Sequence, residues 1–215
     1  MKERSSATFV KWSIYILSFA EVASAVSSYM QFSLLQKLNS GVLSSTEFAI
    51  LATSSDHRDQ VIARLTLIVL IVSFSVSAEW LYKAAKFYSN VGATGLKFTP
   101  GWTVGWFCIP ILNIWKPYQA VRQLYQVATD WRNWQSIPVP NIFRLWWGLW
   151  LFSNAVGQML FRTSDSLTEI GSIQMYNLAC VATLPIDLGL NYVFLKIVLD
   201  ISGKLDSIEE PSIES

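Results

Sequence analysis

Long apolar segments place the strongest limit on what this chain can fold into. Four of them run at about residues 9–35, 61–84, 142–161 and 173–201, and the second contains L-T-L-I-V-L-I-V-S-F-S-V-S-A without a charge. A helix needs about 20 apolar residues to cross a bilayer. Only helices and closed barrels satisfy their backbone hydrogen bonds there. The sequence therefore predicts an all-α integral membrane protein with four transmembrane helices.

The composition agrees with a membrane protein. Of 215 residues, 52% are hydrophobic and 14% are charged, whereas soluble domains carry about 25% charged residues. Ten Trp and eight Tyr suit a chain with membrane–water interfaces. A net charge of +1 gives no basic field for nucleic acid, so the expected partner is the lipid bilayer. We predict a single polytopic domain over residues 1–201 and a disordered acidic tail over residues 202–215.

The first apolar segment has a second interpretation. Lys2, Arg4 and Lys11 resemble the basic region of a signal peptide, Trp12–Phe19 its apolar region, and Ala23–Ala25 an A-x-A cleavage site. The apolar character continues to Leu35, which favours a retained span. Small residues at 20, 23, 24, 27 and 28 would let another helix approach this span closely.

An aromatic stretch from Phe98 to Tyr118 is apolar but repeatedly broken by Pro and Gly. The part over residues 101–115 is too short for a relaxed span, which favours a re-entrant or interfacial segment. Helical spacing of apolar residues follows over 117–131 and is typical of an amphipathic helix in the headgroup layer. We therefore predict a Pro/Trp-rich helical hairpin over residues 98–131, with Trp131, Arg132 and Trp134 as interface anchors. The alternative is a kinked packing segment that binds nothing.

Lys and Arg are distributed unevenly along the chain. They concentrate before residue 12, between residues 83 and 144, and near the C-terminus. Cytoplasmic loops carry the excess of positive charge. Both termini and the hairpin are thus expected on the cytoplasmic side of a bacterial inner membrane. If residues 101–115 formed a fifth span, Lys116, Arg122 and Arg132 would be translocated, so the charge rule argues against that alternative.

Polar residues inside the predicted spans form a second group of candidates. Glu21, Asn154 and Asp187 fall near mid-membrane, with Asn191 one turn beyond Asp187. A charge at that depth costs about 2.5–3.5 kcal/mol on insertion scales. Pro185 precedes Asp187 and removes a helix hydrogen bond. Two interpretations stay open: hydrogen bonds that fix helix packing, and a proton- or ion-coupled carrier or channel subunit.

The segments between the spans carry further expectations. Residues 36–60 are interpreted as a polar connection with a short helix at Ser45–Ala52, capped by Ser44 or Ser45 with Glu47 in its first turn. His57, the chain's one histidine, is expected to be a solvated loop residue and not a metal ligand. Glu79 and Lys83 have the spacing of a helical ion pair. The two cysteines, Cys108 and Cys180, are expected to be small buried hydrophobes.

One motif resembles a known family. The pattern W-F-x-x-P-x-x-N-x-W-x-P-Y runs from Trp106 to Tyr118, and a later span opens with Trp146-Trp147 and contains Asn154. Together these are similar to the bacterial DUF4328 family, over roughly residues 81–162. The resemblance implies a multi-span bacterial membrane protein and implies no activity.

The residues favour a non-enzymatic function. The sequence contains no G-x-S-x-G, H-E-x-x-H, P-loop or cysteine cluster, so neither a cofactor nor a metal is expected. The leading hypothesis is a module that docks anionic lipid headgroups or another membrane protein, with basic Lys97, Lys116, Arg122 and Arg132 nearby. The alternative is the carrier or channel subunit. The candidate docking residues are Trp106, Pro110, Asn113, Trp115, Pro117, Tyr118 and Arg122.

The orientation of the hairpin can be tested by cysteine labelling in intact cells. With Cys108 and Cys180 replaced by Ser, single cysteines at Thr99, Gln119 and Ser136 should all react only from the cytoplasmic side, because the flanking positive charges resist translocation. Labelling of Gln119→Cys or Ser136→Cys from outside would mean that residues 101–115 cross the membrane.

Overall fold

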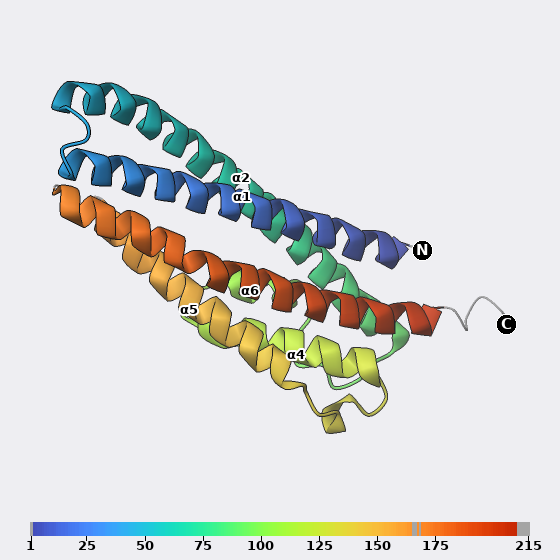
Figure 1. Cartoon of the computed structure of the whole chain (residues 1–215). Coiled ribbons are helices and arrows are strands. Elements are labelled where there is room, and N and C mark those ends of the chain that lie inside the picture. Colours follow the sequence, from blue (N-terminus) through green and yellow to red (C-terminus); the bar gives the residue numbers. More distant parts are fainter. Residues whose placement is uncertain (1, 165–166, 168, 210–215) are drawn as a thin grey trace. The chain divides into compact units, whose positions relative to one another are not determined.

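The structure is a computed structural model that describes residues 2–164, 167 and 169–209. Within these residues every element of regular structure is helical, so the predicted all-α class is confirmed (Figure 1). In chain order the elements are α1 (Lys2–Asn39), α2 (Ser45–Val91), α3 (Pro100–Gly105), η1 (Trp106–Cys108), η2 (Leu112–Ile114), α4 (Lys116–Thr129), η3 (Trp134–Ser136), α5 (Asn141–Ser164) and α6 (Ile170–Glu209).

Three helices of the described chain are long and apolar enough to cross a membrane: α1, α2 and α6. Only 6% of the most apolar window of α2 is buried by the rest of the chain, so its side chains need an apolar surrounding such as lipid. These helices support a membrane protein. Helix α5 covers the third predicted span with 24 residues, and a count of four spans stays a prediction.

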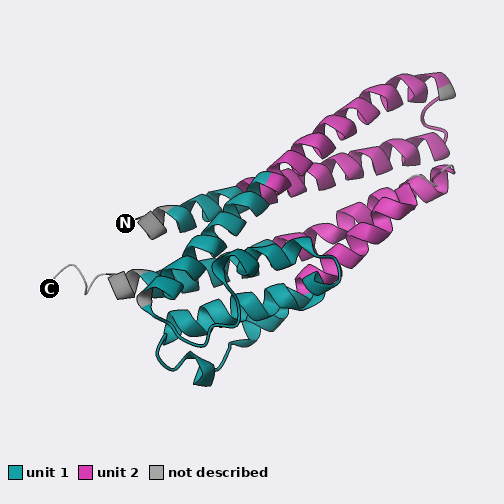
Figure 2. Cartoon of the chain, turned by 180° about the vertical axis from the view of Figure 1, so that it is seen from behind, with its two compact units in different colours: residues 1–14, 72–148, 191–215 teal, residues 15–71, 149–190 magenta. Residues whose placement is uncertain are grey.

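The chain divides into two compact units, shown in different colours in Figure 2. Unit 1 comprises residues 1–14, 72–148 and 191–215, and unit 2 comprises residues 15–71 and 149–190. Helices α1, α2, α5 and α6 therefore each contribute one part to each unit. The prediction of a single domain stays a prediction.

Unit 1 is built around α4. Most side chains of this helix are buried, including Val121, Leu124 and Tyr125. The Tyr125 ring lies 4.8 Å from the ring of Phe143 on α5, and the Lys204 ammonium lies 5.1 Å from the Tyr125 ring centroid. A helix lying in the headgroup layer would keep a wide polar face in water. Helix α4 buries its apolar side chains within unit 1 and leaves Gln119, Arg122 and Thr129 exposed, and its place in the headgroup layer stays a prediction.

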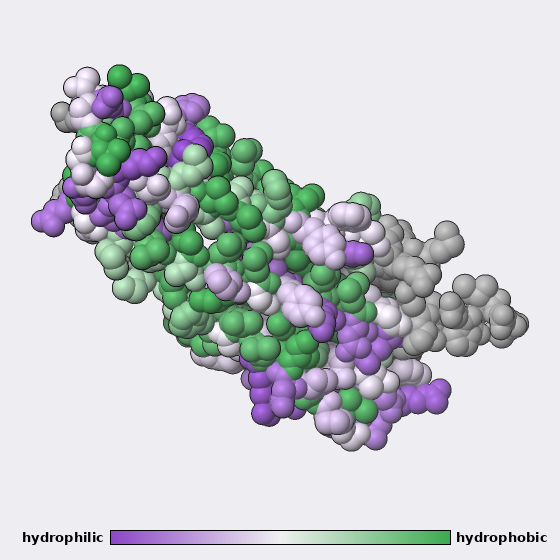
Figure 3. Space-filling view, viewed as in Figure 1, coloured by the Kyte–Doolittle hydropathy of each residue, from purple (hydrophilic) through white to green (hydrophobic). Residues whose placement is uncertain are grey.

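Unit 2 contains the close approach predicted from small residues. The hydroxyls of Ser24 on α1 and Thr66 on α2 lie 2.9 Å apart in a hydrogen bond. Ala25 and Ser27 on α1 are also buried. Small side chains let the two backbones come near enough for hydroxyl groups to meet. Figure 3 shows hydrophobic residues along the sides of α1 and α2 and hydrophilic ones gathered where the two helices join.

Helix α2 corrects the predicted polar connection at residues 36–60. It runs without a break from Ser45 to Val91, so the short helix at Ser45–Ala52 is only its first part. No Pro or Gly interrupts these residues. The predicted start is confirmed: the backbone N–H of Glu47 donates to Ser44 Oγ at 3.3 Å, and Ser44 N–H donates back to Glu47 Oε2 at 3.0 Å.

The prediction of disorder from residue 202 is wrong for residues 202–209. Helix α6 continues to Glu209, while residues 210–215 lie outside the described residues. The continuation has a packing reason. Ser202 and Leu205 are buried in unit 1, and the Trp80 indole N–H donates to Ser202 Oγ at 3.0 Å.

The structure bears on three predictions about side chains: the Glu79–Lys83 ion pair, the position of Trp134 and the burial of the two cysteines. The salt bridge between Glu79 and Lys83 is confirmed, at 2.6 Å. Trp134 is buried and its indole N–H donates to the Thr94 carbonyl at 3.0 Å, so it is not an interface anchor. Cys108 is exposed and Cys180 is half-buried, both as free thiols. The turn of η1 places Trp106 against Trp102, and Cys108 is left on the surface.

Replacing Ser202 with Ala should destabilise the protein. The change leaves the buried Trp80 indole N–H without an acceptor, which costs about 1–3 kcal/mol. The free energy of unfolding can be measured by SDS titration in detergent micelles. Ser89→Ala, an exposed site on α2, is the control and should match the unchanged chain. Equal stability of the Ser202 and Ser89 variants would contradict a structural role for this hydrogen bond.

Candidate functional site

The aromatic segment, defined as residues 98–118, begins after a short glycine-containing link. Gly92 and Gly95 adopt positive φ values of 94° and 73°, which glycine tolerates best. Thr99 then caps α3, since its hydroxyl accepts from the backbone N–H of Trp102 at 3.4 Å. Pro100 stands at the first position of that helix, where its missing N–H carries no penalty. The chain thus enters the segment in a fixed direction.

Short turns replace a spanning helix in the middle of the segment. After η1 the chain turns at Ile109 and Pro110, and the Asn113 backbone N–H donates to the Ile109 carbonyl at 2.8 Å. The Trp147 indole N–H from α5 donates to the Ile114 carbonyl at 2.9 Å. A fifth span would need a helix of about 20 residues, and the longest helix between residues 100 and 115 has six. Side chains from elsewhere in unit 1 therefore satisfy this irregular backbone.

Aromatic rings and one lysine hold the segment against itself. Trp102 and Trp106 stack with ring centroids 4.5 Å apart. The Lys116 ammonium lies 5.4 Å from the Trp106 ring centroid and 5.6 Å from that of Phe98. A cation over an aromatic face is attracted by about 0.5–1 kcal/mol at exposed sites and more when desolvated. Lys116 thus links the start of α4 to Trp106 on η1 and to Phe98 at the beginning of the segment.

Gly105 lies close to the Trp102 ring where the two tryptophans stack. A Cβ at this position would lie 3.1 Å from Cε3 of Trp102, closer than a normal van der Waals contact. The sequence pattern gave only a break in the apolar run here. The structure shows a close approach of a ring to the backbone.

The surface of the segment combines apolar and basic side chains. Trp102, Ile111, Ile114 and Trp115 are 41–71% exposed, and Pro110 is exposed beside them. Exposed basic side chains occur in the same unit at Lys97, Arg122 and Arg132. Exposed Trp with neighbouring Lys and Arg is typical of residues that contact a membrane–water interface.

Two buried polar atoms in the segment have no hydrogen-bond partner among the described residues. They are Nε1 of Trp106 and Oδ1 of Asn113, both closed to solvent. Buried polar groups in native proteins are nearly always paired. Each unpaired group costs about 1–3 kcal/mol. These two atoms therefore mark the least satisfied part of the segment.

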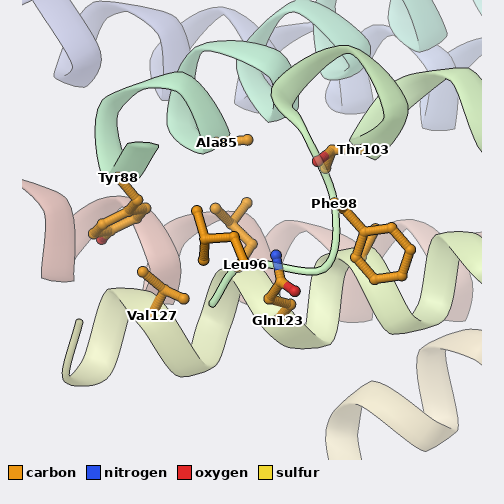
Figure 4. A pocket seen from close by; sticks show the side chains of 9 residues that line it. Ala85, Tyr88, Leu96, Phe98, Thr103, Gln123 and Val127 are labelled. Carbon is orange, nitrogen blue, oxygen red and sulfur yellow. The ribbon is translucent and has the colours of Figure 1, made fainter. Parts of the chain in front are cut away.

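A small cavity lies between Phe98 and helix α4. Its volume is about 10 Å³, and its lining includes Tyr88, Leu96, Thr103 and Gln123 (Figure 4). The Gln123 side-chain oxygen accepts from the Lys97 backbone N–H at 2.8 Å and so ties α4 to the link. A water molecule needs about 10–15 Å³. The cavity has no room for a lipid headgroup.

Comparison with known proteins gives a family and no function. The model of the family DUF4328, described as a domain of unknown function, matches residues 45–203. The chain belongs to the DUF4328 family. No curated protein and no solved structure matches the chain. The family predicted from the Trp106–Tyr118 motif is confirmed, and the match extends well beyond residues 81–162 on both sides.

The candidate docking residues of this DUF4328 chain differ in exposure. Pro110, Trp115 and Arg122 are exposed, whereas Trp106, Asn113 and Tyr118 are half-buried. Pro117 is fully buried at the start of α4. The Tyr118 ring lies 6.3 Å from that of Trp147. Thus Pro117 and Tyr118 help to position the segment, while Pro110 and Trp115 form part of its surface.

The predicted intramembrane cluster is only partly assembled. In unit 2, the Ser153 hydroxyl donates to Asp187 Oδ1 at 2.7 Å, and Glu21 is half-buried. Asn154 is exposed, and its amide donates to the Trp150 carbonyl of its own helix at 2.8 Å. Asn191 belongs to unit 1. Pairing of Asp187 with a serine supports the packing interpretation of that residue, and Asn154 lacks the inward position that a carrier site requires.

Unit 2 also contains a polar network that the sequence analysis missed. Arg58 on α2 donates to the hydroxyls of Ser27 and Ser55 at 2.8 and 2.7 Å and lies 3.1 Å from Asp59 Oδ1. Ser27 also donates to Asp59, and Ser55 donates to Gln31. In the sequence, the run S-S-D-H-R-D resembles a polar loop because its charged and hydroxyl side chains follow one another directly. On a continuous helix, residues 55, 58 and 59 face α1 together.

His57 is exposed on α2, next to this network. No cluster of three or more His, Cys, Asp or Glu able to hold a metal occurs within the described residues. Helix α2 replaces the loop expected around His57, and the histidine lies on the surface of that helix.

Replacing Arg58 with Met should loosen the pairing of α1 with α2. Met keeps an aliphatic stem but leaves Asp59 and two serines without the guanidinium, and the half-exposed site limits the cost to about 1–2 kcal/mol. SDS titration in micelles measures the free energy of unfolding. Arg64→Met, on an exposed position of the same helix, is the matched control. A loss no larger than that of the control would show that the network contributes nothing to stability.

Proposed function

We propose that this DUF4328 protein is a non-enzymatic, multi-pass protein of the bacterial inner membrane whose aromatic segment docks anionic lipid headgroups. In this proposal four helices, α1, α2, α5 and α6, span the bilayer with both termini in the cytoplasm. The segment then forms an interfacial hairpin on the cytoplasmic side.

One observation carries the proposal: exposed apolar side chains of an irregular segment stand in the same unit as exposed basic ones. Ile111 is 71% exposed and Trp115 is 41% exposed. Such side chains gain free energy on leaving water, about 25 cal/mol per Å² of apolar area. The segment holds them in place through the Trp147 hydrogen bond and the packing of α4.

The charges supply the preference for anionic lipid. Lys97 and Arg122 are exposed. A basic side chain near an anionic membrane surface contributes about 1 kcal/mol. Ordinary positive-inside anchoring needs only the charges, whereas docking also needs the exposed side chains of Ile111 and Trp115. The combination favours a site over a simple anchor.

A partner membrane protein is the other occupant that the same surface would suit. Lipid is favoured because exposed tryptophans and exposed cations occur in the same unit, a combination that membrane interfaces also show. A carrier function has less support, because Asn154 is exposed and Asp187 already has a hydrogen-bond donor in Ser153.

The proposal predicts a charge-dependent affinity for phosphatidylglycerol. The Lys97→Gln/Arg122→Gln double variant should bind about 30-fold more weakly, since two basic residues contribute about 2 kcal/mol. Short-chain phosphatidylglycerol is added to purified protein in neutral detergent, and the rise in unfolding temperature gives the affinity. Arg162→Gln, an exposed basic residue at the end of α5 in unit 2, is the control. Equal loss in both variants, or none, would contradict docking at the segment.

A further inference from the structure

We infer that Trp106 and Asn113 form the polar recognition pair of the docking site and select a phosphodiester headgroup that carries a free hydroxyl. The inference rests on the proposed function, because it assigns the lipid class that the segment takes. It starts from the two unpaired buried atoms and not from the exposed surface.

The two atoms offer complementary chemistry. Trp106 Nε1 is a donor only, and Asn113 Oδ1 is an acceptor. An anionic phosphodiester has oxygens that accept from an indole N–H. A headgroup hydroxyl has a proton for the amide oxygen. Phosphatidylglycerol carries both groups on one small headgroup, whereas a lipid without the hydroxyl would leave Asn113 unpaired.

The neighbouring cation fits the same ligand. The Lys116 ammonium lies 5.4 Å from the Trp106 ring centroid. The ammonium lies over the face of the same indole whose N–H would donate to a phosphate, so it adds positive charge to the surroundings of that phosphate. Trp106, Asn113 and Lys116 all come from the motif that runs from Trp106 to Tyr118.

Ligand binding has to open the turn, because both atoms are closed to solvent in this structure. The turn is suited to this. It consists of two three-residue 3₁₀ helices around exposed Pro110, and short 3₁₀ segments have weak hydrogen-bond geometry. Neither atom has a hydrogen-bond partner in the closed form, so opening breaks no hydrogen bond of these two groups.

The test uses Trp106→Phe, which keeps an aromatic ring and removes the N–H, and Asn113→Leu, which keeps the approximate shape and removes the amide. Asn113→Ser serves as a second variant if the leucine side chain prevents folding. The controls are Trp12→Phe, an exposed tryptophan on α1, and Asn154→Leu, whose amide bonds its own helix. Circular dichroism verifies the helical content of each variant.

Affinity is measured from the rise in unfolding temperature of the full chain in neutral detergent. The ligands are short-chain phosphatidylglycerol, phosphatidylmethanol, phosphatidylcholine and soluble glycerol 1-phosphate. The unchanged protein should prefer phosphatidylglycerol to phosphatidylmethanol at least fivefold. Trp106→Phe should weaken both anionic lipids about tenfold. Asn113→Leu should lower only phosphatidylglycerol, to the level of phosphatidylmethanol.

Several outcomes would overturn the inference. Unchanged phosphatidylglycerol affinity in both variants, with loss in the Lys97/Arg122 double variant, would remove the recognition pair and leave docking intact. Unchanged affinity in all of these variants would remove the proposed function as well. Saturable binding of glycerol 1-phosphate as tight as that of the lipid would assign the site to a soluble phosphate ester.

Discussion

The need to satisfy backbone hydrogen bonds away from water governs this molecule. Helices α1, α2 and α6 meet it internally over long apolar stretches. The aromatic segment cannot, because Pro and Gly interrupt it. Its turns rely on outside groups instead, most clearly the Trp147 indole that donates to the Ile114 carbonyl. An irregular segment shielded from water persists only where other groups complete its hydrogen bonds in this way.

Helix α4 supports that segment from within unit 1. Its buried face packs on Phe143 and on the last turns of α6, where Lys204 lies over Tyr125. Gln123 accepts a hydrogen bond from the Lys97 backbone N–H in the link before the segment, and the Lys116 ammonium lies over the Trp106 ring inside it. The exposed side chains of Ile111 and Trp115 therefore belong to a segment that a packed helix supports.

The two groups of polar side chains in the chain have different roles. The Arg58 network in unit 2 pairs each of its charges and hydroxyls, which suits a contact that fixes α1 against α2. Trp106 and Asn113 in unit 1 keep a donor and an acceptor unpaired. A satisfied network stabilises one arrangement, whereas unpaired buried groups favour any ligand that completes them. In our proposal, structure and recognition are thus served by different residues.

The amino-acid sequence by itself determined the all-helical class, the long apolar helices, the Ser44 cap, the Glu79–Lys83 pair and the family. These depend on local spacing and composition, which can be read along the chain. It misjudged residues 45–60, the exposure of Trp134 and the helical end at residues 202–209, and it did not predict how much of α4 is buried. Each of these is decided by partners distant in sequence: Ser27 for Arg58, Phe143 for Tyr125, Thr94 for Trp134 and Trp80 for Ser202. Only the tertiary structure decided which polar atoms found such partners and which, like those of Trp106 and Asn113, did not.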